Sequence, residues 1–295
     1  MEILDQNFLL GIVFLISLCI GSFMNVVIYR VVKGESVSNG RSYCPSCKNQ
    51  LKWYHNIPIF SWIFLRGKCG FCKEHISIQY PIVELLVSII GVLAYLNSGL
   101  TIYSIAIFLT FTTLLSISII DLKYKLVPDN LSFIAISFAI LHNPNIINSL
   151  HFAIIMVGFF AILRIMGEMI FKKEIMGEGD LMIAGIIGAM LPSFTQSMTA
   201  LMVTSSIAIL PSLYSKYKGN RTETTIDSRF ENIEYIVNEM SLIDKEDVIF
   251  QQKVSLFKEG VENMKYKVNG DIGIPFIPFL FIGLFITYFF NINFY

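Results

Sequence analysis

Two aspartates stand where apolar runs of this sequence meet polar residues. Asp121 ends the run at 102–120, and Asp180 opens the run at 181–191 within Gly177-Glu178-Gly179-Asp180. An ionisable residue at the edge of a membrane segment is costly, and is therefore a functional hypothesis by default. Two neighbouring carboxylates tend to share a proton, so that one can activate a water while the other polarises a carbonyl. The pair predicts aspartic-protease chemistry if both side chains lie on the same side of the membrane.

Other roles for the two aspartates stay open on the residues alone. Membrane carboxylates also bind the coupling ion in ion-coupled transporters, although those sites lie near the midplane between repeats, and no repeat is visible here. Asp121 can cap a turn, and Asp180 can be the N-cap of the following helix. Asp129, which follows Pro128, is interpreted as the N-cap of the segment after it.

Three further residues are candidate supports for this chemistry. Gly177 and Gly179 lack a Cβ, which permits a tight turn and the close approach of a helix or an extended peptide. Glu84 lies about one turn into the apolar segment 80–97. It has either a site role or a structural one, in which it caps the helix or reaches interfacial water. Arg164 and Glu168, one turn apart in another apolar segment, are interpreted mainly as a structural ion pair.

Four cysteines form two pairs with the spacing of a metal site. Cys44 and Cys47 flank Pro45-Ser46, and Cys69 and Cys72 flank Gly70-Phe71. Each pair can form a tight turn that offers two thiolates, and Gly70 is expected to ease one of these turns; four cysteines predict a closed, structural zinc site. His55 and His75 flank the cluster as alternative ligands, and a disordered loop is the competing interpretation. Cys19 is expected only to pack.

The elements that must position these residues are membrane helices. The chain is 54 % hydrophobic and 15 % charged, with a mean hydropathy of +0.64. Several runs approach the ~20 residues that a spanning helix needs. Residues 1–7 contain no Lys or Arg, so a cleavable signal is not expected. We predict an all-α polytopic protein with eight spans, at about 8–29, 80–97, 101–120, 127–142, 150–171, 179–192, 195–214 and 272–290.

The distribution of positive charge predicts the orientation. Of the 22 lysines and arginines, all except Arg164 fall at 30–79, 123–125, 172–173 and 215–271. The alternate loops near 98–100, 143–149 and 193–194 carry none. Because basic loops stay in the cytoplasm, both termini are expected outside and both aspartates at the cytoplasmic surface. The cysteine loop then lies in the reducing cytosol, which disfavours disulfides. A formal net charge of zero gives no reason to expect a nucleic-acid partner.

The same reasoning divides the chain into five parts. We expect a first transmembrane helix at 1–29, a small zinc-binding cytosolic loop domain at 30–79, a transmembrane core at 80–214, a charged cytosolic insertion at 215–271 and a last transmembrane helix at 272–295. In the insertion, apolar residues recur at helical spacing among many charges. We expect one or two amphipathic helices there, either as a solvated appendage or as a docking surface.

The motifs taken together resemble a known family. Gly177-Glu178-Gly179-Asp180 matches the glycine-x-glycine-aspartate signature of intramembrane aspartyl proteases. Gly21 to Arg30, the paired cysteines, Tyr80 to Leu85, Ile120-Asp121 with Pro128-Asp129, and Ile274 to Phe279 resemble, in order, the signatures of type IV prepilin peptidases. The chain departs from that pattern at Met182, where the family usually has lysine, and at Ile277, where it often has glycine.

The resemblance implies a function and its site. Members of the family cut the leader from prepilin-like or pseudopilin precursors at the cytoplasmic face of the bacterial inner membrane. Those with the cysteine loop usually also methylate the new N-terminus with S-adenosylmethionine. By motif position the catalytic pair is Asp121 and Asp180, and Glu84, at the base of the cysteine loop, is expected to serve the methyl transfer. No glycine-rich nucleotide-binding turn marks a place for S-adenosylmethionine.

Overall fold

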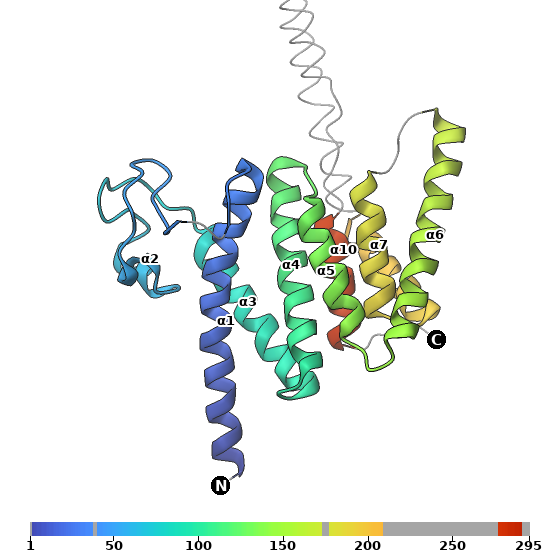
Figure 1. Ribbon diagram of the computed structural model, residues 1–295, viewed down its shortest axis with the longest axis horizontal. Coiled ribbons are helices and arrows are strands. Elements are labelled where there is room, and N and C mark those ends of the chain that lie inside the picture. Colours follow the sequence, from blue (N-terminus) through green and yellow to red (C-terminus); the bar gives the residue numbers. More distant parts are fainter. Residues whose placement is uncertain (1, 38–39, 173–176, 209–276, 291–295) are drawn as a thin grey trace, which may run out of the picture. The chain divides into compact units, whose positions relative to one another are not determined.

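The computed structural model describes residues 2–37, 40–172, 177–208 and 277–290, so the predicted insertion at 215–271 lies outside the described residues. Regular structure in these ranges is helical, which confirms the predicted all-α class (Figure 1). The named elements are α1 (Glu2–Lys33), the 3₁₀ helix η1 (Trp53–Asn56), α2 (Phe60–Phe64), α3 (Gln79–Ser98), α4 (Ile102–Tyr124), α5 (Asp129–Leu141), α6 (Ile146–Phe171), α7 (Glu178–Met190) and α10 (Ile277–Phe290). Residues 194–208 are helical as well.

Within the described residues, four helices are long and apolar enough to cross a membrane. These are Gln6–Lys33 of α1, Gln79–Ser98, Ile102–Tyr124 and Ile146–Ile170. The helices α5 and α10 are apolar but shorter. A helix of 13 residues such as α5 or α7 is about 20 Å long, less than the ~30 Å of a bilayer core. Four of the eight predicted spans therefore have full spanning length, and the other four stay predictions.

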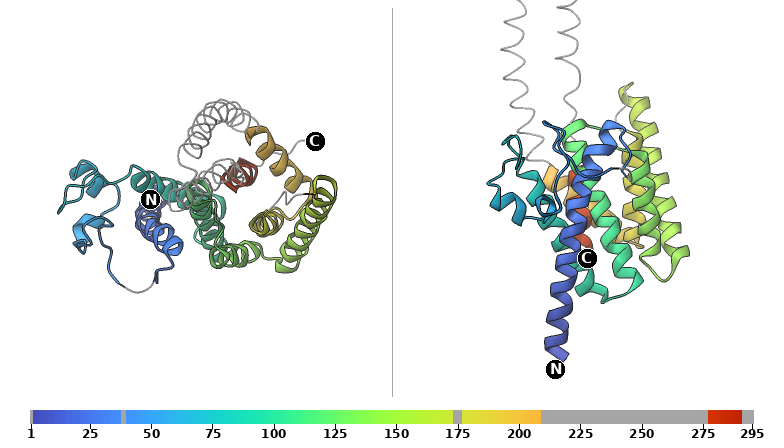
Figure 2. Two further views of the ribbon diagram at one scale, coloured as in Figure 1. Left: turned by 90° about the horizontal axis from the view of Figure 1, so that it is seen from above. Right: turned by 60° about the vertical axis from the view of Figure 1, so that its left-hand side comes forward.

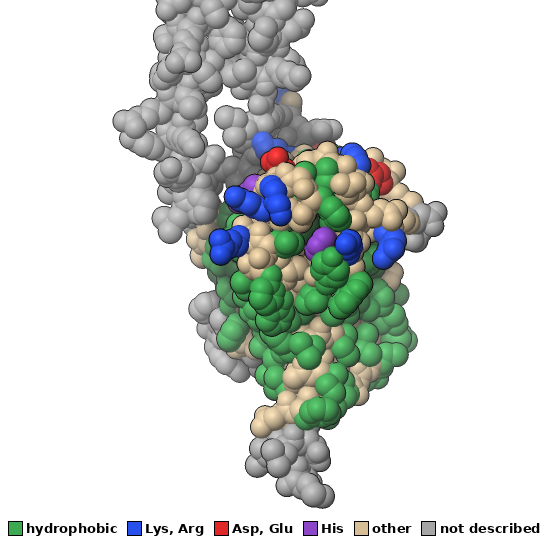
Figure 3. Space-filling view, turned by 90° about the vertical axis from the view of Figure 1, so that its left-hand side faces the viewer, with side chains coloured by type: hydrophobic (Ala, Val, Ile, Leu, Met, Phe, Trp, Pro, Cys, Tyr) green, Lys and Arg blue, Asp and Glu red, His purple; other side chains and the backbone are tan. Residues whose placement is uncertain are grey.

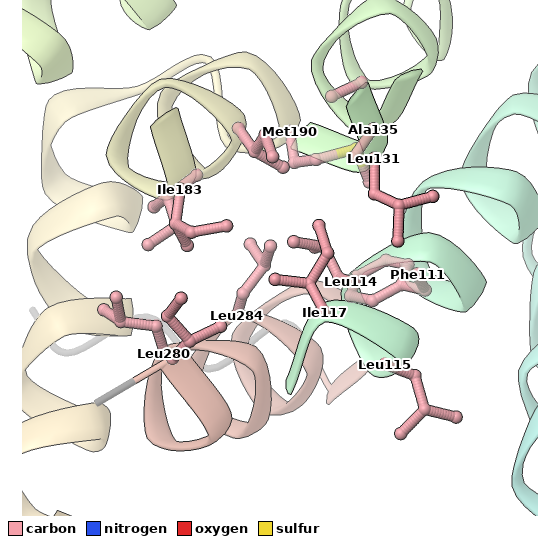
Figure 4. Close-up of a cluster of buried hydrophobic side chains, with 14 of the residues drawn as sticks. Phe111, Leu114, Leu115, Ile117, Leu131, Ala135, Ile183, Met190, Leu280 and Leu284 are labelled. Atoms are coloured by element: carbon pink, nitrogen blue, oxygen red, sulfur yellow. The ribbon is translucent and has the colours of Figure 1, made fainter. Parts of the chain in front are cut away.

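The helix α4 lies at the centre of the bundle and contacts α1, α3, α5 and α10 (Figure 2). Its sequence is apolar on every side, as expected for a helix surrounded by others. Phe111, Leu114 and Ile117 of α4 point into a cluster shared with α5, α7 and α10, whereas Leu115 points to the other side of α4 (Figure 4). This packing fixes the end of α4, where Asp121 stands.

Three buried hydroxyl groups on α4 are satisfied within the helix itself, whereas Thr112 Oγ1 is buried without a hydrogen-bond partner among the described residues. The side chains of Thr110, Ser116 and Ser118 donate hydrogen bonds of 2.8–3.0 Å to main-chain carbonyls four residues earlier. A polar group in an apolar interior costs free energy unless it is hydrogen-bonded. The hydroxyls therefore occupy the core without a partner from another helix.

The helices α6 and α7 pack closely through a glycine. A Cβ at Gly188 of α7 would lie 2.8 Å from Met156 Cγ and 2.9 Å from the Phe152 carbonyl carbon of α6. Small residues at such a contact let two membrane helices approach backbone to backbone. On α6 the predicted Arg164–Glu168 ion pair forms, with 2.8 Å between Nε and Oε1.

The face that carries α1 and the cysteine loop separates charge from apolar surface (Figure 3). Lysine and arginine side chains gather at one end of this face, over the loop, and hydrophobic side chains cover the region below. The large apolar residues Phe8, Leu15, Ile16 and Phe23 of α1 are more than half exposed. A surface of this kind requires an apolar surrounding, because monomeric soluble proteins rarely expose so large a patch.

Candidate functional site

Asp121 lies in the last turn of α4 and is buried, with 7 % of its surface exposed. Its Oδ2 accepts a hydrogen bond of 3.3 Å from the main-chain N–H of Ile277, the first residue of α10. Its main-chain carbonyl accepts from Lys125 N at 2.9 Å, and Lys125 closes the helix with a φ of 52°. The side chain is thus held by a contact 156 residues away in sequence and not by a local cap.

Asp180 lies in the first turn of α7 and is half-buried. Gly177 is the N-cap of that helix, so the open interpretation of Asp180 as the N-cap is wrong. The two carboxylates lie near enough for like-charge repulsion to act between them, and Lys125 acts on Asp121 with the opposite sign. The structure therefore places the two aspartates that the sequence singled out within electrostatic range of each other, and their roles stay a prediction.

The two glycines of the motif differ in their surroundings. A Cβ on Gly179 would lie 2.6–2.9 Å from the side-chain carbons of Val127, in the connection between α4 and α5. A Cβ on Gly177 would have nothing within 4 Å among the residues that the structure describes. Close approach within the protein is therefore required only at Gly179, while Gly177 leaves open space beside the aspartates.

The prediction for Asp129 is wrong by one position. Pro128 is the N-cap of α5, and Asp129 is the first helical residue, without a side-chain capping bond. Proline before the helix leaves no N–H to satisfy, and an acidic residue in the first turn interacts favourably with the helix dipole. Asp129 is exposed, so it is not part of the buried pair.

The four cysteines come together as predicted. The ligand atoms of Cys44, Cys47, Cys69 and Cys72 all lie within 4.8 Å of one another, and the Sγ atoms of Cys44 and Cys72 are 3.9 Å apart. Zn–S bonds of about 2.3 Å at a tetrahedral centre place sulfur atoms about 3.8 Å apart, so the set fits zinc. Within the described residues this group contains cysteines only, and neither His55 nor His75 belongs to it.

The two cysteine turns have the same main-chain design. The N–H of Lys48 donates to Cys44 O, and that of Lys73 donates to Cys69 O. Both lysines have positive φ, 59° and 62°, immediately after the second cysteine of their pair. Gly70 does not have positive φ, and a Cβ there would lie 3.0 Å from the ring of His55, so the structure adds a close approach to the predicted role of Gly70 in the turn.

Main-chain donors prepare one thiol for metal binding. Burial opposes ionisation of Cys69, but the N–H groups of Cys72 and Phe71 and the neighbouring thiols outweigh it and lower its pKa to about 7. Thiolates, not thiols, bind metal. The loop thus favours the ligand form of Cys69 before any ion arrives.

Glu84 joins the cysteine loop to the helices. It is buried on α3, and its Oε2 accepts a hydrogen bond of 2.7 Å from the main-chain N–H of Ile59. Ile59 has a φ of 61°, which is strained for a β-branched residue. The main chain of Glu84 also packs closely on α1, because a Cβ on Gly21 would lie 2.8 Å from Glu84 Cα. Glu84 therefore contacts loop and helices alike, and among the described residues neither aspartate is a hydrogen-bond partner of its side chain.

Two buried polar residues of α1 were not singled out as site residues by sequence reasoning. Arg30, counted there as a loop charge, is 4 % exposed, and its guanidinium donates to the main-chain carbonyls of Ser36, Val37, Gly40 and Arg41. Asn25 is 3 % exposed and donates from Nδ2 to Tyr80 O at 3.2 Å. A polar residue inside an apolar run was the available signal for Asn25.

Comparisons with known proteins identify the family. Residues 15–98 match the bacterial peptidase A24 N-terminal domain, and residues 106–213 match the type IV leader peptidase family. A protein of Vibrio cholerae named prepilin leader peptidase/N-methyltransferase is 34 % identical over 60 % of this chain and 75 % of its own length. The chain belongs to the type IV leader peptidase family. It is a multi-pass membrane protein of a bacterial family.

Two other relatives in this family have the same name, prepilin leader peptidase/N-methyltransferase. The protein of Myxococcus xanthus is 33 % identical over 72 % of this chain, a match that covers 66 % of the relative. The protein of Legionella pneumophila is 29 % identical over 74 % of this chain and 86 % of the relative. No solved structure matches the chain significantly. Because the chain belongs to this family of peptidases, we do not retain the alternative that it is an ion-coupled transporter.

Proposed function

We propose that this chain is a prepilin leader peptidase and N-methyltransferase of the bacterial inner membrane. The name shared by the relatives supplies the two activities and the prepilin-like substrate. The observation that supports the peptidase assignment is the electrostatic interaction of Asp180 with Asp121, two carboxylates at helix ends far apart in sequence.

In the proposed cleavage, the two carboxylates share one proton because both cannot ionise cheaply at short range. The ionised one takes a proton from water, whose oxygen attacks the scissile carbonyl, while the protonated one donates to the carbonyl oxygen. When the tetrahedral intermediate collapses, the C–N bond breaks and the carboxylate pair returns a proton to the leaving amine. The Ile277 N–H holds Asp121 in place for this role through its main chain. Any residue with an N–H can make that bond, so the departure from glycine at 277 is compatible with it.

This chain also has a positively charged side chain near the two aspartates. The family's usual lysine two residues after the second aspartate is Met182 here. Lys125, one turn after Asp121, interacts electrostatically with that carboxylate and is exposed at the end of α4. We infer that Lys125 supplies the positive charge that position 182 lacks.

The second proposed activity needs S-adenosylmethionine, which supplies an electrophilic methyl group. Transfer to the neutral amine of the cut pilin forms an N–C bond, leaves S-adenosylhomocysteine and releases one proton. We assign acceptance of that proton, or balance of the amine's charge, to Glu84. Zinc bound by the four cysteines would hold the loop at 30–79 at the membrane surface, where the new amine forms. We propose that the peptidase site and the methyltransferase site both face the cytoplasm and that both termini lie outside.

Substitution of Asp180 by Asn tests the peptidase assignment. The change keeps the shape of the side chain but removes its proton chemistry, so we expect the rate of leader removal to fall about 10³-fold or more. The assay is conversion of prepilin by membranes that contain the variant, followed by gel shift. Asp129→Asn is the matched control, because Asp129 is an exposed carboxylate next to the same site, and it should cut at the normal rate. Normal processing by Asp180→Asn would refute the assignment.

A further inference from the structure

A cavity of about 350 Å³ lies between α1, α3 and the cysteine loop. Its wall includes Asn25, Tyr29, His55, Trp62, Tyr80 and Glu84. Ligand-binding pockets begin at about this volume and combine apolar rings with a few placed polar groups. The cavity is separate from the two aspartates, neither of which lines it.

Two polar atoms of this wall have no hydrogen-bond partner within the described residues. They are Oδ1 of the buried Asn25 on α1 and Nδ1 of His55 in η1. A buried polar atom without a hydrogen-bond partner destabilises the protein, so such atoms indicate a missing partner. The two belong to different segments of the wall, which favours a ligand that carries several separate donors.

The charged and aromatic groups of the wall favour a cation. Glu84 supplies a buried carboxylate, and its contact with Ile59 N keeps the loop over the cavity. The rings of Trp62 and Tyr80 also line the wall, and an aromatic ring attracts a positive charge more strongly where water is excluded. Arg30 also lines the cavity and keeps its positive charge, but main-chain carbonyls of residues 36–41 accept hydrogen bonds from its guanidinium and offset part of that charge.

We propose that this cavity is the binding site for S-adenosylmethionine, an inference that rests on the proposed methyltransferase activity. The ligand combines a cationic sulfonium with an adenine amine, two ribose hydroxyls and an ammonium group as donors. A lipid or detergent chain offers no donor to Asn25 or His55. The N-terminus of a cut pilin offers one ammonium group, and its chain continues as a polypeptide that a cavity of this size does not hold.

The chain's two tryptophans provide the test. Trp62 lines the cavity, whereas Trp53 is 74 % exposed on the same loop and does not. In full-length, zinc-loaded protein, Trp53→Phe leaves Trp62 as the only tryptophan, and Trp62→Phe leaves Trp53. S-adenosylhomocysteine is the probe, because it shares the adenosyl group and is not turned over. We expect saturable quenching in Trp53→Phe and none in Trp62→Phe, with binding to wild type measured in parallel by equilibrium dialysis.

A substitution in the wall gives an independent measurement. Asn25→Leu removes the unpaired acceptor, and its binding of S-adenosylhomocysteine should weaken about tenfold, the equivalent of one lost buried hydrogen bond. Zinc content and helical circular dichroism show whether this variant folds, and the tryptophan pair decides the question if it does not.

The possible results separate this proposal from the function on which it rests. Binding by dialysis with unchanged Trp62 emission, or with unchanged affinity in folded Asn25→Leu, would place the donor elsewhere and leave the methyltransferase intact. Absence of binding in dialysis would overturn both. A Trp62 response to detergent or to pre-cleaved pilin peptide, but not to S-adenosylhomocysteine, would assign the cavity to that other occupant.

Discussion

At the scale of single residues, groups with a distinctive side chain could be found from the sequence, and groups that act through the main chain could not. Asp121 and Asp180 stand out because carboxylates are rare beside apolar runs. The contact that holds Asp121 comes from the N–H of Ile277, and every residue except proline has one. The residue type at position 277 therefore does not predict this hydrogen bond. Gly70 was singled out for its place in the turn, but its close approach to His55 became visible only in the folded loop.

Glu84 provides a residue-scale prediction that separates the two activities. Glu84→Gln keeps an oxygen that can accept the Ile59 N–H and removes the charge. We expect methylation of pre-cleaved pilin to fall about 100-fold, the scale of one acid–base group, while leader cleavage stays near normal. Asp121→Asn should show the reverse in the same single-turnover assay, read by mass spectrometry. Equal loss of both activities in Glu84→Gln would mean that Glu84 acts only as a structural anchor.

The cysteines provide a second prediction at this scale. Purified protein should contain about one zinc per chain, and Cys47→Ser should lose it, because a structural site needs all four ligands. Cys19→Ser is the control, since Cys19 is a free cysteine on α1 outside the cluster, and its zinc content should be normal. Elemental analysis gives the answer. Zinc-free wild-type protein whose loop still resists protease would contradict the site.

At the scale of elements, hydropathy placed the helices but not their ends. The first span was predicted at 8–29, while α1 runs over Glu2–Lys33, because the turns at each end continue the helix although charged residues such as Asp5 and Lys33 lower their hydropathy. Local signals were informative where a side chain caps the helix. Thr101 and Ser104 form a reciprocal capping box at the start of α4. Asp129 was assigned one position late because Pro128, without an N–H, took the capping position itself.

The cavity is the element-scale feature that sequence reasoning missed. The motif that can be recognised in a sequence is a glycine-rich turn after a strand, which binds nucleotide-like ligands in soluble proteins. Here the wall combines two helices with a loop held by Glu84 and the cysteine turns, so its residues are scattered between 19 and 84. Scattered contacts of this kind depend on tertiary structure and leave no periodic pattern in the sequence.

Two glycines give a matched test of helix packing. A Cβ at Gly188 would collide with the main chain of Phe152, whereas a Cβ at Gly158 on α6 would have nothing within 4 Å. Gly188→Ala should therefore lower the free energy of unfolding by about 1–3 kcal/mol, because the two backbones cannot separate without loss of packing. Gly158→Ala should be neutral or slightly stabilising, since alanine favours helix. Thermal unfolding in detergent distinguishes the two, and equal transition temperatures would rule out the close contact.

At the scale of the whole molecule, the position of the active site depends on the number of spans. Asp121 ends one helix and Asp180 begins another, with α5 and α6 between them. Crossings by both α5 and α6, as predicted, would return the chain to the same side, and the electrostatic interaction between the two aspartates agrees with this. The sequence could make that deduction because counting crossings needs no side-chain geometry. The short length of α5 and α7 is the part that counting did not settle.

The orientation of the chain provides the last prediction. Basic residues gather at the end of the molecule that carries the cysteine loop (Figure 3), and a short basic loop resists translocation. Alkaline phosphatase fused after residue 99 should therefore be active, as an exported enzyme, while a fusion after residue 126 should be inactive. A fluorescent protein that matures only in the cytosol should give the opposite pattern at the same two points. If phosphatase were active after 126, both aspartates would face away from the cytoplasm. The proposed cleavage at the cytoplasmic face could then not take place.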